Sequence, residues 1–139
     1  MIIQDTNVIS ALMRPDANRK VVSWLDRQPR LSVWTTAITI LQAEYGLAIM
    51  LAGRQRQALT AAMRRLTGEI FDGRVLAFDH SAAQAAASLA ADRARRGQIV
   101  DAHGTQIAGI VLAWRAALAT RNVKHFADAG LSVINPWGD

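Results

Sequence analysis

The sequence predicts one α/β domain with a mostly parallel central sheet. Short apolar runs of strand length alternate along the chain with longer segments whose apolar residues recur at the period of a helix. This alternation is typical of βαβ units, in which neighbouring strands run parallel. A length of 139 residues, of which 51% are hydrophobic and 19% charged, fits a single domain spanning 1–139 with a substantial core.

The first element is expected to be a buried strand over residues 1–4 that breaks off at Asp5. An amphipathic helix is expected at 7–13, with Thr6 or Asn7 as its capping residue. In open α/β sheets, ligands bind beyond the carboxyl ends of the strands. Asp5 therefore stands at the edge of the sheet where chemistry is expected.

The remaining elements follow from the same periodicities and from Gly and Pro as stop signals. The long central helix, for example, is expected to end at Gly53. The expected helices are 17–28, 37–52, 55–67, 81–96 and 103–115. The expected strands are Arg30–Thr35, Gly73–Phe78, Ala117–Thr120 and Leu131–Ile134, with a turn or short helix at 123–129.

Composition excludes several classes of function. The absence of cysteine excludes disulfides and thiolate metal sites and fits a reducing, cytoplasmic setting. No apolar run approaches the roughly 18 residues of a membrane span, and no targeting pattern is visible. The chain has no phosphate-binding glycine loop, no Gly-x-Ser-x-Gly elbow and no Cys/His nucleophile set, so neither a nucleotide cofactor nor covalent catalysis is indicated. A net charge of +5 favours a polyanionic partner.

The helix at 37–52 carries one polar residue on its apolar face. The stripe expected to point inward consists of Ile38, Leu41, Tyr45, Ala48, Ile49 and Ala52. Gln42 falls inside this stripe, whereas Glu44 falls on the side where a solvated carboxylate belongs. A polar side chain on a buried face must be paired. Gln42 is therefore either a satisfied core amide or part of a polar pocket.

Two further polar groups stand at the ends of predicted elements. Asp101 precedes the apolar helix at 103–115 and is placed to cap it. Thr120-Arg121-Asn122 follows the strand at 117–120, where Asn122 either lines a site or only forms a turn. The three histidines (His80, His103 and His125) have no metal-site spacing and are interpreted as surface or capping residues.

Taken together, several short blocks resemble the PIN-domain ribonuclease family, and within it the VapC and FitB type of toxin from toxin–antitoxin pairs. The blocks are residues 1–9, 36–39, 45–46, 106–110, 118–123 and 135–137, which run in the expected order over nearly the whole length. The resemblance implies a PIN-like α/β/α sandwich. It also implies an endoribonuclease in which carboxylates at the strand tips hold Mg²⁺ or Mn²⁺, and a metal-activated water attacks the RNA phosphate.

The family's site positions carry over unevenly. The first aspartate matches Asp5, the glutamate falls on Gln42, and the second aspartate falls on Gly104. The last acidic position falls on Asn122, with Thr120 at the neighbouring polar position. Neutral amides attract a divalent cation less than carboxylates do, so the resemblance implies a depleted site.

Among the other acids, Asp101 lies one helical turn before position 104 and is expected to assist Asp5 as a metal ligand. Glu44 lies on the wrong side of its helix to replace residue 42.

Two functions follow from the resemblance. The first is a Mg²⁺-dependent endoribonuclease toxin whose basic helices, Arg54–Arg65 or Arg93–Arg96, contact RNA phosphates. The second is a catalytically inactive binding module. In either case the expected partners are a cognate antitoxin, operator DNA bound through that antitoxin, and a second copy of the chain. The apolar segments at Ile49–Leu51 and around Trp24 and Trp34 are either ordinary core or exposed surface used for these contacts.

Overall fold

The structure is a computed structural model that describes residues 1–138; Asp139 lies outside the described residues. Its five strands form one sheet in the order β3-β2-β1-β4-β5, and every pair is parallel. The strands are β1 (Ile2–Gln4), β2 (Val33–Thr36), β3 (Val75–Leu76), β4 (Ala117–Ala119) and β5 (Ser132–Ile134). The predicted parallel sheet is thereby confirmed.

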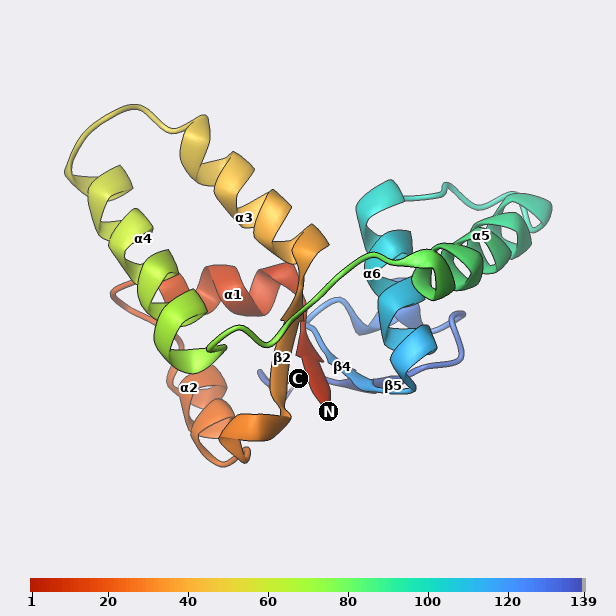
Figure 1. The fold of residues 1–139 in the computed structure, drawn as a ribbon, viewed down its shortest axis with the longest axis horizontal. Coiled ribbons are helices and arrows are strands. Elements are labelled where there is room, and N and C mark those ends of the chain that lie inside the picture. Colours follow the sequence, from red (N-terminus) through yellow and green to blue (C-terminus); the bar gives the residue numbers. More distant parts are fainter. Residues whose placement is uncertain (139) are drawn as a thin grey trace.

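Helices cover both faces of the sheet (Figure 1). One layer contains α1 (Thr6–Met13), α2 (Arg19–Asp26), α3 (Ala37–Ala48) and α4 (Arg54–Arg65), and the other contains α5 (His80–Arg95) and α6 (Ala102–Trp114). Shorter helical turns are η1 (Arg30–Ser32), η2 (Leu66–Ile70) and η3 (Val123–Phe126). The arrangement is the predicted α/β/α sandwich. Among the described residues, no helix combines the length and apolarity needed to cross a membrane.

The sheet, with β1 at its centre, separates the apolar core into a part on each of its two faces. Ile3 and its β4 neighbour Leu118 face α5 and α6, while Ile2 and Ala119 pack on the opposite side, near α1 and α2. This alternation follows from the two-residue period of a strand. The N–H of Asp5 donates to the carbonyl of Ala119, so β1 ends beside β4 and presents Asp5 at the carboxyl edge.

The cap of α1 differs from the prediction. The N-cap residue is Asp5 itself, whose carboxylate accepts the N–H of Thr6 at 2.8 Å, rather than Thr6 or Asn7. The helix begins at Thr6, directly after the strand, which leaves no residue between the carboxylate and the first turn.

The orientation predicted for α3 is wrong. Leu41, Tyr45 and Ile49, expected to face inward, are 54%, 63% and 65% exposed. The buried residues are Thr39, Ala43 and Leu47. The Thr36 hydroxyl accepts the N–H of Thr39 at 3.0 Å, and both threonines are fully buried. The 39-43-47 face, which continues from Thr39, packs toward the core.

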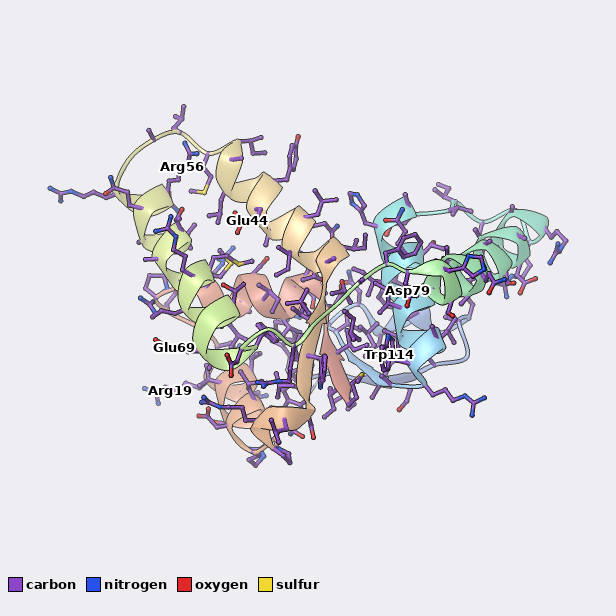
Figure 2. The ribbon with its side chains drawn as sticks, in the orientation of Figure 1. Arg19, Glu44, Arg56, Glu69, Asp79 and Trp114 are labelled. Atoms are coloured by element: carbon purple, nitrogen blue, oxygen red, sulfur yellow. The ribbon has the colours of Figure 1, made fainter. Side chains whose placement is uncertain are left out.

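The same helix is also shorter than predicted. It ends at Ala48, and Gly53 instead precedes α4, where it is the N-cap residue. Ile49 and Leu51 are exposed, as one of the two interpretations of that segment expected, whereas Trp24 and Trp34 pack against the core. Glu44 is exposed on α3, as predicted (Figure 2).

Candidate functional site

A cavity of about 720 Å³ opens at the carboxyl edge of the sheet. Its lining contains five of the predicted site residues, namely Asp5, Gln42, Asp101, Gly104 and Asn122. These residues come from the end of β1, from α3, from the start of α6 and from the segment after β4. The structure therefore brings together positions that are as far apart in sequence as 5 and 122. Thr120, the remaining predicted residue, is fully buried and reaches the site through Asp5.

Asp5 is buried at the floor of this cavity, with 7% of its surface exposed. One carboxylate oxygen accepts the N–H of Thr6, and the other accepts the hydroxyl of Thr120 at 2.8 Å. Burial raises the pKa of Asp5 above its usual value, although these hydrogen bonds and nearby His125 act in the opposite direction. The negative charge of Asp101 adds to the increase.

Thr120 organises the polar residues around Asp5. Its hydroxyl donates to Asp5 and accepts from the side-chain amide of Asn7 and from the N–H of Asn122, both at 3.1 Å. The side-chain oxygen (Oδ1) of Asn7 in turn accepts the backbone N–H of Arg121 at 3.2 Å. Asn7 thus links the start of α1 to the loop after β4, and the polar floor of the pocket depends on both.

Gln42 is a satisfied polar residue beside the cavity. Its amide oxygen accepts a hydrogen bond from the Thr6 hydroxyl, and its amide nitrogen lies 3.3 Å from Nδ1 of His103. Of the two interpretations left open by the sequence, the polar pocket is therefore the one the structure supports. A carboxylate at this position would carry a charge that the amide does not.

Asp101 and Gly104 lie at the start of α6. The carboxylate of Asp101 accepts the N–H of Gly104 at 3.0 Å, which confirms the predicted helix cap. The same carboxylate oxygen lies 3.2 Å from Nε2 of His125, which follows β4 on η3. His125 also lines the cavity, although its position in the sequence suggested only a surface or capping residue.

The residues present do not fit the Mg²⁺ or Mn²⁺ site implied by the resemblance. Such ions take carboxylate oxygens as their main protein ligands. Of the four family positions, only Asp5 carries a carboxylate. Within residues 1–138, no three His, Asp or Glu side chains are grouped so that they could hold a metal ion. A metal shared by Asp5 and Asp101 remains a prediction.

The cations that line the cavity differ from those predicted to contact RNA. Arg14 and Arg121 border it, whereas the arginines of α4 and α5 are not among its lining residues. Arg93 is wrongly assigned as an RNA contact, because it is buried and bonds Asp128 with its Nε and Nη2 nitrogens. Arg93 also donates to the carbonyl of His125 at 2.9 Å, so it anchors the segment that carries this histidine.

Comparisons with known proteins cover nearly the whole chain. A family model described as PIN domain matches residues 2–128. The chain is 39% identical over 140 residues to the VapC ribonuclease Y4jK of Sinorhizobium fredii, covering 99% of this chain and 98% of that protein. It is 34% identical to Toxin FitB of Neisseria gonorrhoeae, covering 100% of both chains.

A solved structure gives the same result. The structure of FitAB bound to an IR36 DNA fragment matches with a TM-score of 0.88 and 34% identity, covering 99% of this chain and 96% of that chain.

Proposed function

Because the chain belongs to the PIN-domain family, and within it to the VapC and FitB group of toxins, we propose that it is the toxin-type member of a toxin–antitoxin pair. In this role it binds a cognate antitoxin in the cytoplasm, and its RNA-cleaving activity is impaired. The observation that carries the proposal is a pocket that keeps the family's arrangement but retains only Asp5 of its expected carboxylates.

The loss of charge supports the impaired activity. Gln42 is neutral and both ends of its amide are occupied, and Gly104 has no side chain at all. Asp5 alone offers one charge, and burial disfavours that charge. Each carboxylate that is missing weakens the attraction for a divalent cation, since these ions depend on charged oxygen ligands.

Activity and metal binding are tested on the same protein. Calorimetry with Mn²⁺ is expected to show no binding at millimolar metal, and RNA incubated with Mg²⁺ is expected to be cleaved no faster than in EDTA. The 39% identical VapC ribonuclease serves as the positive control. Mg²⁺-dependent cleavage that disappears in an Asp5→Asn variant would contradict the impaired activity.

A groove between α1, α3 and α4 supports antitoxin binding. It has a volume of about 480 Å³, and its lining includes Met13, Leu47, Met50 and Leu59, with Arg14 among the charged residues nearby. An apolar groove with a polar rim is suited to an amphipathic helix. The related FitB toxin occurs in the FitAB complex with DNA, which supports an antitoxin-mediated link to operator DNA for this chain.

The groove can be tested without disturbing the core. Ala58 is exposed on α4 and lines the groove. An Ala58→Arg variant, co-expressed with the antitoxin gene of its own locus, is expected to lose most of the antitoxin that co-purifies with the wild type. The matched control is Ala87→Arg on the exposed side of α5. Equal co-purification by both variants would place the antitoxin elsewhere.

The exposed stripe on α3 supports association with a second copy of the chain. Leu41, Tyr45 and Ile49 are spaced four residues apart and more than half exposed, which is unusual for apolar side chains gathered on one helix face. A Tyr45→Lys variant is expected to sediment as a smaller species than the wild type. Leu31→Lys, at another exposed apolar residue, provides the control.

The second candidate is an active Mg²⁺-dependent endoribonuclease. It is favoured by the placement of Asp5 and Asp101 on the lining of one cavity, where both carboxylates face the same space. The raised pKa of Asp5 is also typical of residues at functional sites. The calorimetry and cleavage experiment above separates the two candidates.

A further inference from the structure

The space beside Gly104 is filled by two other side chains. A Cβ atom added at this glycine would overlap a carboxylate oxygen of Asp101 and would lie 2.7 Å from Nε2 of His125. Gly104 itself is buried. The volume in which the family's aspartate would begin is therefore already occupied by the Asp101 carboxylate and the His125 ring.

The Asp101 carboxylate is held in this space from two sides. The N–H of Gly104 donates to it at 3.0 Å, and His125 lies 3.2 Å from the same oxygen. His125 is anchored in turn, because its carbonyl accepts from the buried Arg93. The two side chains come from α6 and η3, which are separated by the whole of β4. Their meeting beside Gly104 is thus a product of the fold and not of local sequence.

We propose that Asp101 and His125 form a pair that has replaced the family's carboxylate at position 104 and that closes this position to a divalent cation. The inference rests on the proposed function and deepens it. Loss of the acids at positions 42 and 104 removes negative charge from the site, whereas the Asp101–His125 pair fills the volume in which a side chain at position 104 would lie. Restoring the two acids alone is therefore insufficient to rebuild an efficient metal site.

Placing a side chain at position 104 requires the loss of specific interactions. A side chain at position 104 would push the Asp101 carboxylate toward solvent, where half of its side chain is already exposed. That movement breaks the helix cap and the contact with His125. The loss of one cap and one partly exposed contact between a carboxylate and a histidine corresponds to about a tenfold reduction in metal affinity.

An Asp101→Ser substitution separates the pair from the cap. Serine is a preferred N-cap residue, so its hydroxyl can accept the N–H of residue 104, but it carries no carboxylate to meet His125. The replacement therefore keeps the start of α6, removes the carboxylate and leaves the His125 ring without the partner that holds it beside residue 104. If Asp101 only caps α6, Asp101→Ser should not change how well the protein tolerates a side chain at position 104.

The first experiment is a four-corner stability cycle that needs no metal. Thermal unfolding is measured for the wild type, Gly104→Ala, Asp101→Ser and the double variant. We expect Gly104→Ala to lower the melting temperature in the wild type and to lower it much less, or to raise it, when Asp101 is serine. Equal effects of Gly104→Ala in both backgrounds would overturn the inference.

The second experiment measures Mn²⁺ binding by calorimetry. The variants are Gln42→Glu/Gly104→Asp and the same pair with Asp101→Ser. The triple variant is expected to bind Mn²⁺ about tenfold more tightly than the double variant. Equal affinities, or no binding by the triple variant, would overturn the inference. Millimolar or tighter binding by the wild type would instead contradict the proposed function, so the two failures are distinguishable.

Discussion

The packing of α5 against α6 gives a sharp test of the structure at Gly109. A Cβ atom added there would lie 2.5 Å from the carbonyl oxygen of Ala82, 2.7 Å from Cβ of Ala86 and 3.0 Å from the N atom of Ala86. Normal contacts between such atoms are about 3.5–4.0 Å. Two of the three atoms belong to the backbone of α5 and cannot rotate away. Gly109→Ala therefore requires the two helices to separate by about 1 Å.

The expected loss of stability follows from this overlap. Forcing an extra methyl group into a packed core reduces stability by about 1–3 kcal/mol, while replacing a helical glycine with alanine contributes up to about 1 kcal/mol in the opposite direction. We expect a net loss of about 1–2 kcal/mol, which lowers the melting temperature by several degrees in a domain of this size.

The matched control is Gly46→Ala in α3, where no atom outside the neighbouring residues and the backbone of the same helix lies within 4 Å of the added Cβ. This variant gains the helix preference without an overlap and should be more stable by about 0.5–1 kcal/mol. Thermal unfolding followed by circular dichroism compares the two variants with the wild type. A Gly109→Ala variant as stable as Gly46→Ala would refute the close approach of α5 and α6.

Three further predictions concern buried polar groups. Gln4 is fully buried with its amide oxygen unpartnered, while its amide nitrogen donates to the carbonyl of Ile2 at 3.1 Å. Gln4→Leu removes both groups and should raise stability by up to about 1 kcal/mol, and lower denaturant resistance would contradict this. Burial raises the pKa of Asp5, so ionising it in the folded state is unfavourable. Asp5→Asn should therefore melt higher than the wild type at pH 7, with a difference that shrinks as the pH falls through the raised pKa. Arg93 holds the pKa of Asp128 below its usual value, so the stabilising contribution of Asp128 is complete above that usual pKa and is lost as the pH falls through the lowered one. Asp128→Asn should destabilise the protein by about 1–3 kcal/mol at pH 7, because it weakens the charged hydrogen bonds to Arg93, and much less at the acidic end of a pH series.

The elements and the parallel sheet could be predicted because they depend on local periodicity. Alternating apolar runs specify strands and helices, and parallel order follows from their alternation along the chain. The roll of α3 could not be predicted in this way, because both of its faces are apolar. Leu41 and Tyr45 lie on one face, and Ala43 and Leu47 lie on the other. The choice between them depends on tertiary packing, because Ala43 and Leu47 join the buried cluster that contains Ile9.

The candidate site was likewise predicted from the sequence only in part. Asp5 was found from its place at the end of a buried strand, and the other family positions from a resemblance that preserves order and spacing. His125 gave no such signal, because it meets Asp101 only after η3 has been anchored by a buried arginine from α5. A sequence reveals which carboxylates a family member has lost, but only the fold reveals what has taken their place. At position 104 the lost side chain and its replacement are linked, because Asp101, the N-cap residue of α6, supplies the carboxylate that fills the space beside Gly104.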